Sequence, residues 1–568
     1  MLRLLRAIGW SALVLTMAVT LAPTSAFAQA TGQISGIITD SSGAVIPGAT
    51  IDVTNTDTNQ SRSAVSGADG FYTVPLLAPG GYQVKASLTG FRTSVRDGIQ
   101  VTVNGTARVD HKLQVGELSE AVTVEAAAPL VETSNATLGV VIDRQKVVDL
   151  PLNGRNFTQL GTLIPGVVAP PTSLGGQDGN ATPGGFGNTT GGFNVNGMRN
   201  QSNNFLLDGA PNNDSFNTGF VLRPPPDAIQ EFKILTHSYD AEYGRNAGSV
   251  VNVVTKSGSN EWRGSAWEFN RDDSLQAMNH FAITKPALKQ NQYGAGLGGP
   301  LVKNKLFMFS YFEGFTNKQG TTDTRTVLSA DQRNGIFSTS IKDPLTGLPF
   351  PGNIIPADRI NPIAKAYLDK YIPLPNTTNN QVTRSPNVED TRQMFGTRLD
   401  YRVSGNHSLL GRYLWGHTNN VNPLGGSNFS PAGNVGVATL QDVMGSDTWV
   451  VNSKMINVAR LNWNHISAQP NVMSGLNLKD LGYTYAGTNA GAAGLPFVSL
   501  TGFFTAGDAQ QPFASRTNNV FGFSDDLTLV AGQHSFKFGG EIRRDQIKVT
   551  YINRPNGDFT FNGVKTGS

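Results

Sequence analysis

The sequence predicts a mainly β protein that consists of an N-terminal β-sandwich, an α+β domain and an incomplete antiparallel β-barrel. Short β-rich runs separated by turn residues occupy residues 33–115. After Gly258, segments of about ten residues with alternating apolar and polar positions recur. Between these regions we expect several strands and a short helix capped by Asp227.

The composition excludes several classes of protein. The 568 residues carry 44 Lys and Arg against 41 Asp and Glu, a net charge of +3, which does not suit a polybasic nucleic-acid binder. The chain has no cysteine, so disulfides, thiolate metal sites and cysteine nucleophiles are excluded. No grouping of nucleophile, base and orienting acid stands out, and we expect neither enzymatic activity nor a bound cofactor or metal.

The first 28 residues have the pattern of an export signal. Arg3 and Arg6 precede a mostly apolar stretch at residues 8–21, and Ala26-Phe27-Ala28 provides a small-residue cleavage site. The alternative is a membrane anchor, but 14 residues fall short of the roughly 20 that a spanning helix needs. An exported chain of this kind is periplasmic, secreted or an outer-membrane barrel.

Residues 29–116 are predicted to form the sandwich, with Asp69-Gly70 as a tight hairpin turn. The motifs Asp69-Gly70-Phe71-Tyr72, Gly80-Gly81-Tyr82 and Gly90-Phe91 resemble the carboxypeptidase regulatory-like domain. This resemblance implies a transthyretin-like fold related to carbohydrate-binding sandwiches, and it brings no peptidase activity because a zinc-ligand cluster is missing. Tyr72 and Tyr82 are candidates for stacking on a sugar, although core packing is the commoner role of such aromatics.

Residues 117–131 are predicted to be an extended linker. Within it, Glu120, Ala121, Val122, Thr123 and Val124 resemble the TonB box, the segment through which outer-membrane transporters are pulled. This resemblance implies the TonB complex of the inner membrane as a partner, recruited by β-strand addition. The alternative is an ordinary strand, such as the last strand of the sandwich.

Residues 132–258 contain several motifs that resemble, in order, the plug domain of TonB-dependent outer-membrane receptors of the Oar-like type. They are residues 150–157 (LPLNGRNF), 163–167 (LIPGV), 193–199 (FNVNGMR), 205–211 (FLLDGAP), 226–234 (PDAIQEFKI), 241–244 (AEYG) and 248–256 (GSVVNVVTK). The run 205–211 is predicted to form a strand that ends in a tight turn. Asn196 stands where many such plugs carry Arg. As candidates for the family's plug-to-barrel salt bridges we select Arg199, Arg223 and Arg245, with solvated surface charge as the alternative.

Residues 259–568 show the alternation of barrel strands. Phe307, Phe309 and Tyr311 are predicted to face lipid, with the residues between them facing the lumen. In the run 395–402, the odd-numbered positions are predicted to face lipid and Arg398 the lumen, and residues 404–407 form a short periplasmic turn. The stretches 317–389 and 469–518, rich in Asn, Gly and Pro, are predicted to be extracellular loops. A soluble two-sheet sandwich is the alternative.

The number of candidate strands, about nine or ten, is small beside the about 22 of plugged transporters. A half-barrel would leave unpaired strand edges in lipid. The chain ends at Lys565-Thr566-Gly567-Ser568, whereas the resemblance implies a terminal aromatic residue. We therefore expect an N-terminal fragment of a longer product.

The resemblance implies a TonB-dependent outer-membrane transporter gated by its plug, with the sandwich and linker on the periplasmic side. Its implied partners are TonB, outer-membrane lipid and an extracellular ligand, with carbohydrate as one candidate. The alternative is an outer-membrane adhesin or carbohydrate-binding protein that does not transport.

Overall fold

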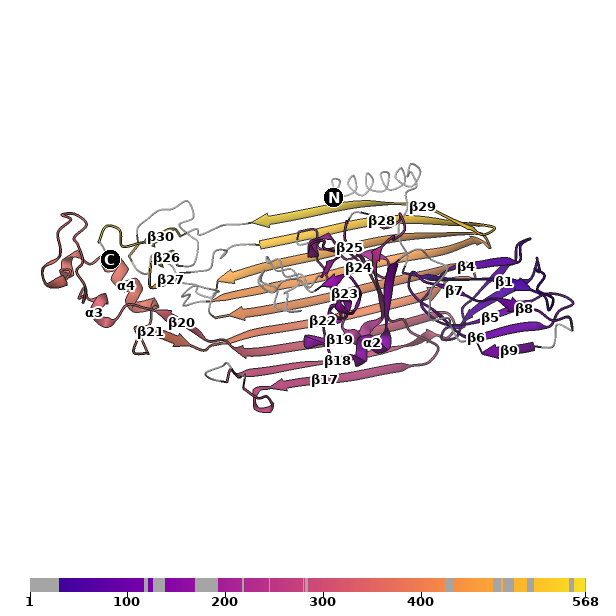
Figure 1. The fold of residues 1–568 in the computed structure, drawn as a ribbon, viewed down its shortest axis with the longest axis horizontal. Helices are drawn as coiled ribbons and strands as arrows, with labels where there is room; N and C mark the ends of the chain where they lie inside the picture. The colour runs from indigo at the N-terminus through magenta and orange to yellow at the C-terminus, as the bar shows by residue number, and fades with distance from the viewer. Residues whose placement is uncertain are drawn as a thin grey trace, which may run out of the picture.

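The structure, a computed structural model, describes residues 30–566 except 117–120, 126–137, 169–192, 217–218, 245, 279, 281–284, 424–432, 473–481, 484–494, 508–514 and 551–555. The predicted signal segment and Glu120 lie outside the described residues. Figure 1 shows a sandwich at one end, a sheet of long strands in the middle with a smaller domain against it, and a group of short elements at the other end. The predicted mainly β fold class is confirmed.

The sandwich consists of two sheets. The first contains β4 (Phe71–Leu77), β1 (Gly32–Thr39), β7 (Thr106–Arg108) and β8 (His111–Lys112). The second has the order β3 (Ser61–Val65), β2 (Thr50–Asn55), β5 (Gly80–Ser87), β6 (Thr93–Val101) and β9 (Ala121–Glu125). The Asp69-Gly70 turn joins β3 to β4, which belong to different sheets, so the predicted hairpin is wrong there.

Alternating apolar positions on these strands form one core between the two sheets. Tyr72 and Tyr82 belong to this core and are 2% and 4% exposed. The Tyr72 hydroxyl donates to the Val109 carbonyl at 2.6 Å, and the Tyr82 hydroxyl donates to the Ala78 carbonyl at 2.8 Å. Both rings therefore take the core role rather than the sugar-stacking role.

The plug is built on a five-stranded sheet. Its order is β10 (Leu138–Asp143), β15 (Ile229–His237), β16 (Val250–Thr255), β13 (Asn204–Leu207) and β14 (Ala210–Pro211). The other elements are α2 (Arg144–Asp149), η1 (Asn153–Arg155), η2 (Phe157–Leu163), β11 (Val167–Val168), β12 (Asn194–Val195), η4 (Asn200–Ser202) and η5 (Pro226–Ala228).

The expected helix cap at Asp227 is wrong. Asp227 lies inside η5, a single 3-10 turn without a side-chain cap, and its carboxylate pairs instead with Arg155. Asp143 caps α2 instead: its carboxylate accepts from the Lys146 amide at the start of that helix at 2.9 Å.

Nine long antiparallel strands form the third part. They are β17 (Arg263–Asp272), β18 (Leu288–Val302), β19 (Leu306–Gly320), β22 (Asn387–Arg402), β23 (His407–Asn422), β24 (Asn434–Asn452), β25 (Met455–Val472), β28 (Ser515–Ala531) and β29 (His534–Thr550). Their order follows the sequence from β17 to β29, and these two edge strands do not pair with each other among the described residues. Short turns join the strands at the sandwich end, as predicted for residues 404–407 (Figure 1). Within the described part of the chain, no helix has the length and apolar character of a membrane span.

The predicted orientation of β19 is wrong. Phe307, Phe309 and Tyr311 are 4–8% exposed, and Phe309 and Tyr311 belong to the same core cluster as the plug. Phe309 pairs in register with Arg398, which contacts the plug, so both side chains lie on the inner face. The outer-face prediction is confirmed in β22, where Phe395 and Leu399 are exposed.

The two predicted long loops are partly folded. At the end opposite the sandwich they contribute β20 (Asp323–Thr326), α3 (Ala330–Arg333), η7 (Pro351–Asn353), η8 (Ala357–Arg359), α4 (Pro362–Tyr371), β21 (Gln381–Arg384), β26 (Phe497–Leu500) and β27 (Phe504–Ala506). β30 (Asp558–Phe561) joins β26 in parallel, and η6 (Asp273–Leu275) follows β17. We call residues 321–386, 495–506 and 556–566 the loop module; Val327, Tyr371 and Phe504 share its core.

Candidate gating site between plug and barrel

The turn between β13 and β14 brings a carboxylate to the barrel wall. Asp208 and Gly209 both have positive φ, 50° and 80°, as the tightest two-residue hairpins require, and Asp and Gly tolerate this conformation best. The Asp208 carboxylate accepts from the Thr255 amide and hydroxyl, each at 2.8 Å. These bonds fix its position at the end of the plug sheet.

Two barrel arginines reach this carboxylate. Arg398 of β22 approaches Asp208 at 3.1 Å, and Arg412 of β23 approaches it at 2.6 Å. Each arginine also holds a barrel carboxylate: Asp400 at 2.8 Å from Arg398 and Asp442 at 2.6 Å from Arg412. We call these five residues the Asp208 cluster.

Burial makes the Asp208 cluster a strong connection. The Arg412 and Asp442 side chains are fully buried and that of Asp208 is 2% exposed. Burial by itself raises the pKa of the Asp208 carboxyl, but Arg398 and Arg412 more than offset this, and the pKa lies below its usual value. The carboxylate is therefore ionised at neutral pH and bound by two charge-assisted contacts.

Further ion pairs connect plug and barrel. Asp214 pairs with the fully buried Arg516 at 2.9 Å, and Lys537 pairs with Glu242 at 3.1 Å and with Asp240 at 3.9 Å. In the opposite sense, Arg155 of the plug lies 3.7 Å from Glu313 of β19. Most of these contacts thus place the acid on the plug and the base on the barrel.

The structure places the predicted plug arginines differently. Arg199 is exposed and precedes η4. Arg223 donates to the Asn156 side chain at 3.0 Å and lines a cavity of about 90 Å³ together with barrel residues. Arg245 lies outside the described residues. Their role in plug-to-barrel bridges remains a prediction.

The sequence contained a signal for the residues that do make these bridges. Arg398 and Arg412 alternate with outward-facing apolar residues, so each is a charge directed at the inner face. A buried arginine requires an acid, and the acid follows directly from the predicted turn at Asp208. Pairing them requires contacts across 190 and 204 residues of chain, which no local pattern provides.

The sandwich contacts the plug through its residues 102–105. The Asn104 carbonyl accepts from Lys233 at 2.7 Å, and its side-chain oxygen accepts from Asn252 at 2.9 Å. The Val103 amide donates to Glu231, whose pKa is raised to about 7 mainly by burial. A sandwich turn therefore fits into a buried polar surface of the plug.

The TonB-box candidate lies beside the sandwich. Ala121, Val122, Thr123 and Val124 fall in β9, which pairs in parallel with β6 from Thr93 to Asp97. β9 is the edge strand of its sheet. Among the described residues, no group of three or more His, Asp or Glu is placed to hold a metal ion.

Long antiparallel strands that hold a separate domain on their inner face through buried ion pairs are the arrangement expected of an outer-membrane β-barrel and its plug, although β17 and β29 do not close the sheet among the described residues. The family model "Outer membrane beta barrel domain" matches residues 254–568, more than half of the chain, and the protein belongs to this family. "TonB-dependent Receptor Plug Domain" matches residues 131–251, and "Carboxypeptidase regulatory-like domain" matches residues 33–114. The predicted resemblances are confirmed, and in these receptors the plug and the N-terminal domain are periplasmic.

Among curated proteins, the chain is similar to the TonB-dependent transporter Oar of Myxococcus xanthus, with 29% identity over 332 residues that cover 55% of this chain and 29% of that protein. It is also similar to the ferrienterobactin receptor of Escherichia coli (strain K12), with 26% identity over 33% of this chain and 26% of that protein. A solved structure with a similar arrangement is the siderophore receptor PirA from Acinetobacter baumannii, with 16% identity, a TM-score of 0.44, and coverage of 73% of this chain and 49% of that chain. The chain thus spans under a third of the two curated relatives and about half of the solved one.

Proposed function

We propose that this protein takes part in TonB-dependent uptake of an extracellular ligand across the outer membrane, with the plug as the gate. The observation that carries the proposal is the Asp208 cluster, because it binds the plug to β22 and β23 through ionic contacts on the inner face. Such contacts can be exchanged for water when the plug moves, at a smaller loss than an apolar interface of the same size. The similarity to a TonB-dependent transporter supports the same function.

We propose further that β9 is the segment on which TonB acts and that β6 holds it until then. Five residue pairs join β9 to β6, and the other edge of β9 is unpaired among the described residues. A partner strand is able either to add to that open edge or to replace β6. Replacement requires β9 to leave the sandwich, and addition does not.

A disulfide between β6 and β9 separates these two possibilities. Asp97 and Glu125 are paired in register, a separation within the range of disulfides, and the chain has no other cysteine. In the double variant Asp97→Cys, Glu125→Cys, all TonB-box candidates stay intact. We expect the oxidised protein to lose capture of the purified periplasmic domain of TonB, and dithiothreitol to restore it, because β9 must leave β6.

The matched control is a disulfide that does not involve β9. Lys85→Cys with Val95→Cys joins β5 to β6 at another registered pair and should leave capture unchanged. Deletion of residues 120–124 should abolish capture under all conditions. If that deletion leaves both TonB capture and cellular uptake intact, the TonB proposal is wrong, and binding without transport becomes the better description.

A further inference from the structure

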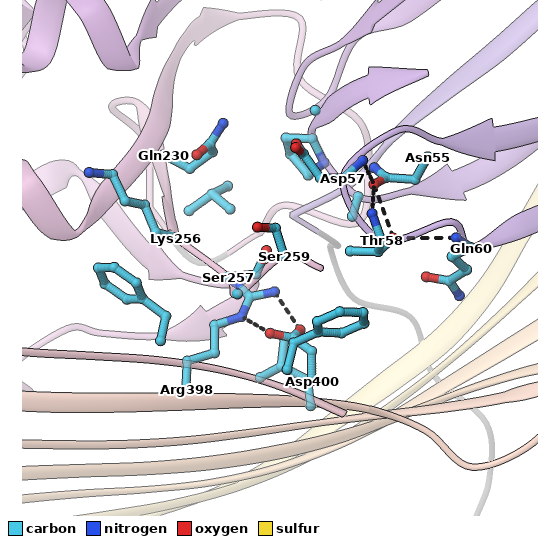
Figure 2. A pocket seen from close by; sticks show the side chains of 18 of the residues that line it. Asn55, Asp57, Thr58, Gln60, Gln230, Lys256, Ser257, Ser259, Arg398 and Asp400 are labelled. Atoms are coloured by element: carbon cyan, nitrogen blue, oxygen red, sulfur yellow. Dashed lines mark hydrogen bonds and ion pairs between the residues drawn. The ribbon is translucent and has the colours of Figure 1, made fainter. Parts of the chain in front are cut away.

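A cavity of about 360 Å³ lies where the sandwich, the plug and the barrel meet. Figure 2 shows it between the sandwich residues Asn55 to Gln60, the end of the plug at Lys256, and Arg398 and Asp400 of β22. We call it the junction cavity. It lies at the sandwich end of the barrel, which is the periplasmic side in this family.

Contacts between the three parts fix the walls of the junction cavity. The Gln60 side chain donates to Ser408 of the barrel at 3.1 Å. The Asn260 amide, just after the plug, donates to the Asp57 carbonyl at 2.9 Å. The Asn55 side chain accepts from the Asp57 and Thr58 amides, each at 3.0 Å, and holds the sandwich turn in shape. The cavity is therefore a built feature of the assembled protein.

The lining carries more positive than negative charge. Seven Lys and Arg side chains and three carboxylates line the cavity. All three carboxylates are engaged by arginines: Asp208 and Asp400 by Arg398, and Asp57 by Arg263 at 3.4 Å. No lining carboxylate is left for the other cations.

Lys256 is the cation with the least compensation. The residue is 8% exposed, and among the described residues its ammonium has no hydrogen-bond acceptor or carboxylate. It lies over the Phe309 ring, 6.0 Å from the ring centroid. Burial, with a smaller contribution from the like charge of Arg144, lowers the pKa of Lys256 to about 8. Lys256 is therefore a mostly buried lysine whose ammonium is not compensated by the described residues, and an anion in the cavity would supply that compensation.

We propose that the junction cavity is a binding site for a small oxyanion, a carboxylate or phosphate group, held by Lys256 with help from Arg144 and Arg402. Arg144, which is exposed, and Arg402, which is partly buried, line the same cavity. The volume suits a phosphate or a small carboxylic acid with some water. Anion binding at this site does not depend on the proposed uptake function. Only the idea that a transported ligand uses the site would rest on that function.

Calorimetric titration of the purified full chain in detergent micelles tests the site, with inorganic phosphate and citrate as probes at constant ionic strength. We expect saturable binding in the wild type. Lys256→Gln should weaken it about tenfold or more because one charge-assisted bond is lost, whereas Lys256→Arg should retain it. The control is Lys454→Gln, which removes an exposed cation on the same side of the barrel, outside the cavity, and should leave the affinity within about twofold.

Thermal unfolding distinguishes loss of the site from loss of the fold. Without anion, Lys256→Gln should melt at or above the wild-type temperature because it removes an uncompensated charge, and phosphate should raise the melting temperature of the wild type only. If Lys256→Gln unfolds, Arg144→Gln on the exposed surface of α2 should still lower the phosphate affinity several-fold. Equal affinity in wild type and Lys256→Gln, or no saturable binding, would overturn the proposal.

Two further measurements separate the source of the anion and the dependence on uptake. An anion that the protein binds permanently in the periplasm should co-purify with the protein and be detected by ion chromatography after denaturation. An anion that is a transported ligand should be absent from the purified protein and bind only when it is added. Deletion of residues 120–124 should abolish TonB capture and leave phosphate binding unchanged. Lys256→Gln should weaken phosphate binding and leave TonB capture unchanged, so the anion-site proposal and the TonB proposal can fail independently.

Discussion

Asp208→Asn should weaken the attachment of the plug to the barrel by about 3 kcal/mol. The Asn side chain keeps an oxygen for the Thr255 amide but loses its charge toward Arg398 and Arg412, and each such bond contributes about 1.5–3 kcal/mol. Because both arginines retain a barrel carboxylate, we expect the lower end of the ~3–5 kcal/mol typical of a broken buried pair. This corresponds to about a hundredfold shift toward the released plug.

Hydrogen exchange of the β13 and β16 amides, followed by mass spectrometry, reports this shift, because the plug sheet opens more readily once the barrel no longer holds it. The matched control is Asp447→Asn, which removes the same group from a half-exposed pair with His407 and should change exchange by about 0.5 kcal/mol or less. Combining Asp208→Asn with Arg412→Met should give a coupling energy of about 2 kcal/mol. Equal exchange in Asp208→Asn and Asp447→Asn would refute the reasoning, because it would mean that the buried contacts do not hold the plug.

Two other regions give further tests. Arg333→Met should destabilise the loop module by about 2–3 kcal/mol, since the Arg333 guanidinium donates to three carbonyls at the end of α4 at 2.6–2.9 Å. In the variant, the α4 amides should exchange faster with solvent and the β22 amides should exchange at the wild-type rate. Equal α4 exchange in the variant and the wild type would contradict this role. Burial, with Arg96, lowers the pKa of His111 to about 4. Since the unfolded imidazole binds its proton near pH 6.5 and the folded one does not, the sandwich should lose up to about 3 kcal/mol as the pH falls from 6.5 to 4. Exchange of β1 amides, corrected for intrinsic rates, should show this loss in the wild type and not in His111→Gln.

The local chemistry of the sequence predicted the features that one segment determines by itself. The alternation of β22 placed Arg398 on the inner face, and the Asp-Gly pair placed a tight turn at residue 208. Both features depend only on nearby residues: the first on the two-residue period of side chains along a strand, and the second on the backbone conformation that Asp and Gly tolerate. The sequence alone does not decide whether β9 is a free linker or an edge strand, because an isolated Val-Thr-Val run suits both.

Two of the wrong predictions, the orientation of β19 and the unfolded long loops, concern features that depend on which other segments pack against a given stretch of chain. In β19, Phe309 and Phe312 point to opposite faces and both are apolar, so alternation does not tell lipid from lumen. The plug makes the inner face apolar at Phe309, as a water-filled lumen would not. In the loop module, a core forms from residues as distant as Val327 and Phe504, and neither stretch shows enough apolar periodicity alone.

The strand β16 connects the two polar interfaces of the plug. Asn252 contacts Asn104 of the sandwich, and Thr255, three residues later on the same strand, contacts Asp208. A pull on β9 that remains paired with β6 would therefore act on the turn that follows β6, then on β16, and then on the Asp208 cluster. A pull on β9 that has left β6 would act through the linker on β10 at the opposite edge of the plug sheet. An edge strand can be removed one pair at a time, whereas the Asn104 contacts with Lys233 and Asn252 lie together in one turn, so we expect the second route to require the smaller force. That route requires TonB to replace β6 on β9, and this is why we expect the β6–β9 disulfide to block TonB capture.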